Sequence, residues 1–217
     1  TCIIFSPRRT FIVLALVFVA IFAGVLTDIP PDRQNLRARL QPPSAEHPFG
    51  TDEFGRSILS RVVHGTRVSL FTGLVPVAIA LVIGTVVGMI AGFYRGRVDG
   101  VLMRVMDVLL AFPSLLLALA VVGALGPGLF NAVIAIAIVD IPQYARVVRS
   151  IVLGAREEDY VHAATALGAS NGRAMFRHIL PATLGPLSVQ ATLGIGFAIL
   201  AMSGLSFRGL GVQPPTA

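Results

Sequence analysis

Few residues of this chain have a type and a spacing that could do chemistry. Asp140 falls in the middle of a long apolar run, two residues before Pro142. A carboxylate at that depth in a membrane costs roughly 2.5–3.5 kcal/mol, so it should face protein or water. Two interpretations stay open: Asp140 and Pro142 lie along a solute pathway beside a proline-loosened turn, or Asp140 makes a buried hydrogen bond between helices. Asp107 lies three residues after Arg104, which predicts a local ion pair.

Residue types exclude several other kinds of site. All seventeen basic residues are Arg, so the chain lacks the Lys of a P-loop and the Lys of a Schiff base. The lone Cys2 cannot form an intramolecular disulfide, and the histidines lack metal-ligand spacing. These histidines are His47, His64, His162 and His178. We expect no catalytic, cofactor or metal site in this chain.

The composition indicates a membrane protein. Hydrophobic residues make up 55% of the 217 positions and charged residues only 13%, whereas a soluble domain carries about 25% charged residues. The pI of about 10.9 is also typical of nucleic-acid binding. However, the arginines lie at the edges of the apolar runs, which favours a topology signal and no nucleic-acid partner.

Apolar runs of spanning length predict an all-α protein with five helices across the lipid bilayer. The first run has the length of a signal peptide or of a span, and the absence of a small-residue cleavage pattern favours a span. The third run is divided by the turn Gly126-Pro127-Gly128. The five predicted spans are residues 10–27, 68–94, the two parts of 105–145, and about 184–207.

The arginine distribution predicts the orientation of these spans. Arginines gather before the first span, around the 95–104 link and around residues 156–178, which places these parts in the cytoplasm. The intervening segment 28–66 is then external, and Thr51 or Asp52 is expected to cap a helix through Ile58 on the membrane surface. The predicted divisions are 1–27 (N-terminal segment and first transmembrane helix), 28–66 (external segment with surface helix) and 67–217 (core transmembrane domain).

Small residues recur every four positions in the second predicted span. They share one helix face, where they let two helix backbones approach closely. Glycine is also common in membrane helices in general, but the strict register favours helix packing. The residues are Ala80, Gly84, Gly88 and Gly92.

A polar, helix-prone segment, residues 156–181, separates the last two apolar runs; we call it the polar insert. It predicts one short helix from Arg156 to Leu167 that stops at Gly168, and a second helix capped by Ser170. Acidic residues 157–159 suit the positive end of the first helix dipole.

One face of the first short helix is small and shallow. It consists of Ala163, Ala164 and Leu167. An amphipathic helix can also rest on lipid, but alanine offers little apolar area for that. We therefore expect this face to fit a groove on another protein.

The spacing within the polar insert resembles a known motif. Ala163, Ala164 and Gly168, followed by Leu180 and Pro181, are in register with the cytoplasmic coupling loop of the permease subunits of bacterial ATP-binding-cassette importers. The family pattern is Glu-Ala-Ala, three residues, Gly, nine residues, Ile-x-Leu-Pro. The insert departs from it in two places, since His162 replaces the glutamate and His178 replaces the isoleucine, with Ile179 just after it. The resemblance assigns the coupling loop to His162, Ala163, Ala164, Leu167, Gly168, Ile179, Leu180 and Pro181.

Further phrases extend the resemblance over most of the chain. GTDEFGR (50–56), FPSLLLALA (112–120), LGPGL (125–129) and FRGLGVQPP (207–215) are similar to the second, "C-type", permease of the dipeptide, oligopeptide and nickel importers. Ser57 departs from the acidic residue expected after GTDEFGR.

The resemblance implies a type I importer helix bundle in the bacterial cytoplasmic (inner) membrane. Six spans are common in this subgroup, so a sixth helix is expected to follow Ala217. The chain would form half of the translocation pathway for di- and oligopeptides or similar small solutes. Its implied partners are a homologous second permease, two ATPase subunits that bind ATP and Mg, and an extracytoplasmic solute-binding protein.

Two other classes of protein are alternatives to this one. An ion-driven secondary transporter generally needs several ionisable groups within the membrane and often has an internal repeat. This chain has one mid-membrane carboxylate and no repeat that we find. A membrane scaffold without transport activity is the third class.

Overall fold

The structure is a computed structural model that describes residues 7–27 and 29–211. Every regular element among these residues is helical, apart from an isolated antiparallel bridge between Thr51 and Ser57. The predicted all-α membrane architecture is confirmed. The chain forms two compact units, and the second comprises Gly73–Gly211. Cys2 and residues 212–217 lie outside the described part.

The first unit begins with two short helices, α1 (Pro7–Ile21) and α2 (Ala23–Leu26). They occupy most of the first predicted span, 10–27. The 15 residues of α1 extend about 22 Å, which is less than the ~30 Å of a hydrocarbon layer. A single spanning helix over this range is therefore not what the structure contains.

An irregular segment with one short helical turn, η1 (Leu36–Ala38), leads to the long helix α3 (Ile58–Tyr94). The helix predicted to start at Thr51 or Asp52 begins at Ile58 instead, and it continues without a break. The reason is local, because the Asp52 carboxylate accepts hydrogen bonds from the amide N–H groups of Phe54 and Arg56, both at 2.9 Å. Those bonds fold a turn in place of a first helical turn.

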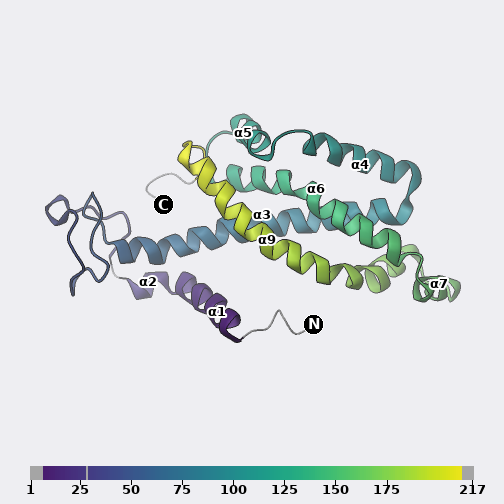
Figure 1. The fold of residues 1–217 in the computed structure, drawn as a ribbon, viewed down its shortest axis with the longest axis horizontal. Helices are drawn as coiled ribbons and strands as arrows, with labels where there is room; N and C mark the ends of the chain where they lie inside the picture. The colour runs from purple at the N-terminus through teal and green to yellow at the C-terminus, as the bar shows by residue number, and fades with distance from the viewer. Residues whose placement is uncertain (1–6, 28, 212–217) are drawn as a thin grey trace. The chain divides into compact units, whose positions relative to one another are not determined.

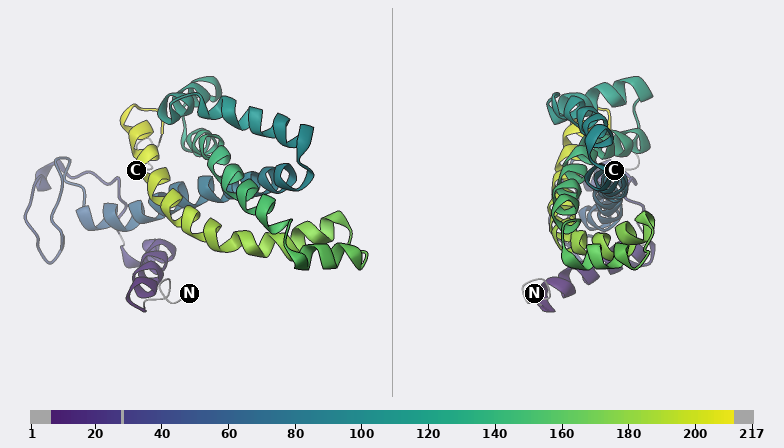
Figure 2. Two further views of the ribbon diagram at one scale, coloured as in Figure 1. Left: turned by 45° about the vertical axis from the view of Figure 1, so that its right-hand side comes forward. Right: turned by 90° about the vertical axis from the view of Figure 1, so that its right-hand side faces the viewer.

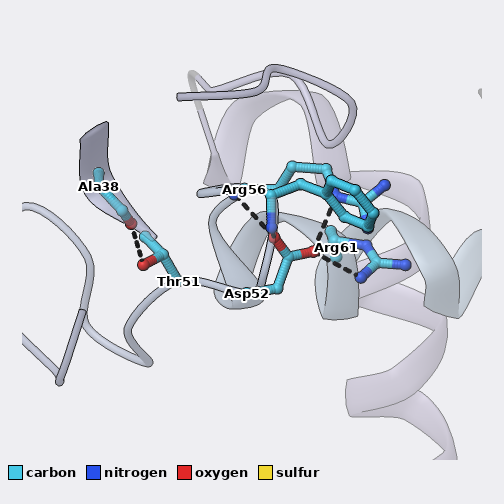
Figure 3. A network of polar contacts seen from close by, with 6 residues as sticks. Ala38, Thr51, Asp52, Arg56 and Arg61 are labelled. Carbon is cyan, nitrogen blue, oxygen red and sulfur yellow. Dashed lines mark hydrogen bonds and ion pairs between the residues drawn. The ribbon is translucent and has the colours of Figure 1, made fainter. Parts of the chain in front are cut away.

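Side chains reinforce this turn (Figure 3). The Asp52 carboxylate also accepts hydrogen bonds from the guanidinium groups of Arg56, at 2.7 Å, and Arg61, at 2.9 Å. The hydroxyl of the buried Thr51 donates to the carbonyl of Ala38. The start of α3 is therefore held by side chains of its own unit.

The second unit is a helix bundle with α6 (Leu129–Ala155) at its centre. Helix α6 packs against α4 (Gly96–Leu110), α5 (Ser114–Leu125) and α9 (Leu180–Phe207). Figure 1 and Figure 2 show these helices around α6. The polar insert joins α6 to α9 through α7 (Asp159–Ala166), α8 (Asn171–Arg173) and the π-helical stretch η2 (Ala174–Ile179).

Three described helices are long and apolar enough to cross a membrane, namely Ile58–Tyr94, Leu129–Ala155 and Asn171–Phe207. The pair α4 and α5 makes a fourth candidate if its two helices, bent by 92°, form one broken span. The prediction of five spans therefore exceeds what the described residues contain. The orientation of the spans stays a prediction.

The third predicted span, the part of 105–145 before the turn at 126–128, is not one continuous helix, because it is broken between α4 and α5. The chain bends at Ala111–Pro113, because a proline disfavours the helical conformation of the residue before it. The predicted turn at 126–128 is confirmed, since α5 ends at Leu125 and α6 begins at Leu129. Its two glycines have the positive φ angles that such a turn needs.

Candidate functional site

The polar insert has the local structure that its capping residues predict. Helix α7 ends at Ala166, and Gly168 follows with φ +87°, the left-handed stop that glycine permits. The Ser170 hydroxyl accepts a hydrogen bond from the Arg173 N–H at 3.4 Å, as expected of a cap. Two boundaries differ from the prediction, since the first helix begins at Asp159 and the second continues into α9.

The predicted coupling residues fall into two groups, one on and just after α7 and one at the start of α9. Leu167 is 90% exposed, and His162, Ala163 and Gly168 are exposed beside it, with Ala164 half-buried. Figure 1 shows α7 at one end of the second unit. An exposed leucine among small residues makes this face suitable for contact with another protein.

The second group anchors the insert. Ile179 is fully buried, Leu180 is half-buried and Pro181 is exposed at the first turn of α9. Helix α7 packs on η2, and η2 on α9. The structure therefore brings the exposed group and α9 together through η2.

Two arginines attach the start of the insert to the end of α3. The Arg156 guanidinium donates to the backbone carbonyl of Phe93 at 2.6 Å and lies 5.5 Å from the centre of its ring. Arg95 donates to the carbonyl of Leu153 at 3.1 Å and forms a 2.5 Å ion pair with Glu157. Arg95 does so from φ +55°, a conformation that costs a non-glycine residue about 1–2 kcal/mol.

His162 lies over a small cavity beneath α7. The cavity has a volume of about 280 Å³, and its lining comes from the end of α3, Arg156, α7 and the start of α8. Thr165 and Asn171 are its other polar residues on the insert. The position where the motif has glutamate thus borders this cavity while it is itself exposed.

Ion pairs tie α4 to α6. The Arg149 guanidinium meets both oxygens of Asp99, at 2.5 and 2.6 Å, the strong bidentate geometry. Arg146 pairs with Asp107 at 2.6 Å. The predicted local pair of Asp107 with Arg104 is therefore wrong, because the α4–α6 packing brings a cation from another helix to Asp107.

The small-residue stripe of α3 faces α6. A Cβ atom built on Gly84 would lie 2.6 Å from the Cβ of Tyr144, and one on Gly92 would lie 2.8 Å from the Cβ of Val152. A Cβ on Gly88 would overlap the carbonyl oxygen of Ala145. Ala80, the remaining member, is fully buried. The α3 and α6 backbones approach so closely that a larger residue at these glycines must displace a helix.

A larger cavity of about 640 Å³ lies between α5, α6 and α9, and Asp140 lines it. Gln143 and Tyr144 of α6 and Gln190 of α9 lie beside it. The Gln190 amide donates to the Gln143 amide oxygen at 3.3 Å. Pro142, the other predicted pathway residue, is fully buried within α6 and is absent from the lining.

Tyr144 is a site residue that was not predicted from the sequence. Its side chain is 2% exposed, and its hydroxyl has no hydrogen-bond partner among the described residues. The available signal was its position four residues after Asp140, which places both on one face of a helix. Among residues 7–27 and 29–211, no three His, Cys, Asp or Glu side chains are grouped as metal ligands would be.

Comparisons with known proteins identify the family. Residues 84–217, more than half of the chain and including α6, the polar insert and α9, match the family described as binding-protein-dependent transport system inner membrane component. A dipeptide transport system permease protein of Alkalihalophilus pseudofirmus is 52% identical over 204 residues, which cover 94% of this chain and 67% of that protein.

Two further relatives are similarly close. A probable D,D-dipeptide transport system permease protein of Escherichia coli is 48% identical over 95% of this chain and 69% of its own length. A di/tripeptide transport system permease protein of Pseudomonas aeruginosa is 48% identical over 94% of this chain and 69% of its own length. With its apolar spanning helices, this multi-pass membrane protein belongs to the family of binding-protein-dependent transport system inner membrane components.

Proposed function

We propose that this chain is the permease subunit that forms half of the translocation pathway of an ATP-driven importer for di- and oligopeptides or similar small solutes. The named cargo of the three relatives described above supports this solute class. Family membership also disfavours an ion-driven secondary transporter and a scaffold, because the family description is that of a transport component dependent on a binding protein.

The proposal includes the other subunits of the importer. A homologous second permease completes the pathway, and an extracytoplasmic solute-binding protein delivers the cargo. Two ATPase subunits bind ATP and Mg and hydrolyse the nucleotide, while this chain itself is not catalytic. The absence of any Lys in the sequence supports this division of labour, because a P-loop uses Lys to reach the nucleotide phosphates.

The single observation that best supports the proposal is the place of the polar insert in the chain. It connects α6 to α9, and these two helices supply most of the lining of the 640 Å³ cavity. Arg156 fixes the start of the insert to α3, and η2 runs into α9 without a gap. A partner that moves the exposed face of α7 therefore moves the two helices that line the cavity.

This arrangement describes how ATP hydrolysis would reach the pathway. The ATPase holds Ala163, Ala164 and Leu167 in a groove, and its closing or opening displaces the insert as a unit. Packed helices move as rigid elements, so the displacement changes the spacing of α6 and α9 around the cavity. The small alanine side chains let the groove of the ATPase approach the backbone of α7 closely.

A reconstituted importer tests the proposal. The chain is purified with its second permease and ATPases, placed in lipid vesicles with the binding protein, and assayed for ATP-dependent uptake of dialanine. Uptake without ATP, or no uptake of any di- or tripeptide, contradicts the proposal.

The variant Ala164→Trp examines the insert within the same assay. It should leave membrane insertion intact but reduce uptake at least about tenfold, because a bulky ring prevents the groove contact. The matched control is Ala120→Trp, which adds the same ring at an exposed position of α5. Equal uptake by both variants would mean that the insert is not the coupling element.

A further inference from the structure

We infer that the Asp140 cavity is a subsite that holds the N-terminal ammonium group of a peptide during its passage. This inference rests on the proposed function and adds to it the part of the cargo that is recognised and the residue that recognises it. The charge balance, the polar atoms and the size of the cavity support it.

The negative charge of Asp140 has no ion-pair partner among residues 7–27 and 29–211. A carboxylate in a membrane helix is retained where it has a partner or a function. Among the described residues, no hydrogen bond or ion pair reaches the Asp140 carboxylate, and the cavity lining contains no cation. The next cations along α6, Arg146 and Arg149, are engaged by carboxylates of α4. The inference assigns the role of the partner of Asp140 to a cation that enters the cavity.

Tyr144, four residues after Asp140, also lines the cavity. Tyr144 is among the residues that line the cavity, but its hydroxyl is buried and has no partner in the described part of the chain. A buried hydroxyl without a partner costs roughly 1–3 kcal/mol. A Cβ on Gly194 of α9 would overlap this hydroxyl, so the hydroxyl fills the space that the glycine leaves. The hydroxyl therefore belongs to the packing of α6 on α9, and the inference does not use it as a contact for the ligand.

The remaining lining fits the rest of a short peptide. The amides of Gln143 and Gln190 can donate to and accept from a peptide group. The apolar residues Leu193 and Phe197 of α9 offer no specific contact and so tolerate different side chains. A volume of about 640 Å³ lies within the usual range of small-molecule sites, about 300–1,000 Å³.

The cavity also indicates which end of the peptide it receives. A peptide carries an ammonium group at one end and a carboxylate at the other. Arg and Lys are absent from the residues that line the cavity, so nothing in it attracts the carboxylate. Asp140 therefore selects the ammonium end.

A charge series at position 140 tests the inference in the reconstituted importer. Asp140→Glu keeps the charge, Asp140→Asn keeps the size and hydrogen-bonding ability, and Asp140→Lys reverses the charge. Dialanine uptake at saturating binding protein should be close to the parent with Glu, roughly tenfold lower with Asn and lower still with Lys. Complex assembly and ATP hydrolysis should persist. The matched control is Asp107→Asn, which removes a carboxylate that already has Arg146 as its partner, and its uptake should match the parent.

A chemical rescue distinguishes the effect of the charge at position 140 on uptake from an effect of the substitution on folding. In a chain with Cys2→Ser, Asp140→Cys is assembled first and then modified with a thiosulfonate reagent that carries either a sulfonate or a quaternary ammonium group. The sulfonate should raise uptake severalfold, and the ammonium should not.

The other possible outcomes contradict either the proposed function or this inference. If the parent complex imports no peptide, the proposed function falls, and this inference falls with it. If the parent imports dialanine and Asp140→Asn matches it, the inference alone is wrong. Loss of assembly in both Asp140→Asn and Asp140→Cys, or equal rescue by both reagents, would instead assign Asp140 to helix packing and also overturn the inference.

Discussion

The guanidinium of Arg156 donates a 2.6 Å hydrogen bond to the backbone carbonyl of Phe93, which joins the end of α6 to the last turn of α3. Phe93 also lies under the same guanidinium. The start of the polar insert is therefore tied to a helix other than the two that it connects. In the proposed mechanism, a force on α7 reaches α3 through this contact and α9 through η2.

Arg156→Ala should weaken this connection. A hydrogen bond from a charged group contributes roughly 1–3 kcal/mol, and partial exposure of Arg156 favours the lower end. We expect uptake per ATP hydrolysed to fall severalfold in reconstituted vesicles while hydrolysis continues. The matched control, Arg97→Ala, removes an exposed arginine of α4 and should keep the parent ratio. Equal ratios for both variants would count against the connection.

Gly168→Val should distort the end of α7. Valine is strained at φ +87°, by about 1–2 kcal/mol or more because it is β-branched. Uptake and ATP hydrolysis are measured in the same vesicles. We expect hydrolysis to continue while uptake falls, so that the two become uncoupled. Gly172→Val is the control, since Gly172 has open space around its Cβ position and no positive φ. Parent-like coupling in Gly168→Val would show that the left-handed stop is dispensable.

Gly88→Val should separate α3 from α6. The added atoms would overlap Ala145 and approach the Cβ of Val148, which lies 2.8 Å from a Cβ built on Gly88. Overpacking of this kind costs roughly 1–3 kcal/mol. The yield of folded protein in detergent and its melting temperature should both drop. Gly100→Val on α4, where nothing lies within 4 Å, should change them little, and an equal drop would argue against close packing.

The turn around Asp52 should weaken in acid. Burial by itself raises the pKa of the Asp52 carboxyl, but the hydrogen bonds from Arg56 and Phe54 outweigh burial and lower the pKa below its ordinary value of 3.8. A lowered pKa means that the stabilisation is complete above pH 3.8 and is lost as the pH falls through the lower, folded-state value.

Hydrogen exchange of the Phe54 and Arg56 amides measures this effect. Protection, corrected for the intrinsic exchange rate, should hold at pH 6 and decrease below pH 3.8. Asp52→Asn should decrease it already at pH 6, whereas Glu53→Gln, at the exposed neighbouring position, should not. Protection that is independent of pH in the parent would refute the role of the carboxylate.

Local signals in the sequence predicted part of this structure well. Gly168 and Ser170 act through the backbone within a few residues, so the end of α7 and the cap after it follow from residue type. The turn at Gly126–Gly128 follows in the same way. Pro113 is also a local signal, but the break that it causes between α4 and α5 was not predicted because apolar residues continue on both sides of it.

Contacts between residues far apart in the chain could not be predicted from the sequence. Asp107 has a possible partner three residues away, yet it pairs with Arg146 because α4 packs along α6. The Arg156–Phe93 contact joins residues 63 positions apart, and neither residue type predicts it. At the start of α3, Asp52 has the type of a helix cap, but its carboxylate binds two amides of a turn.

The central claim, that the exposed face of α7 docks on an ATPase, is tested most directly by crosslinking. With Cys2→Ser as background, Leu167→Cys places a single thiol on α7, and Ser44→Cys places one in the segment predicted to be external. A short thiol-to-amine crosslinker is applied to the assembled complex in vesicles. We expect a crosslink from position 167 to the ATPase subunit and none from position 44. No ATPase crosslink from position 167 in a complex that retains uptake would contradict the claim.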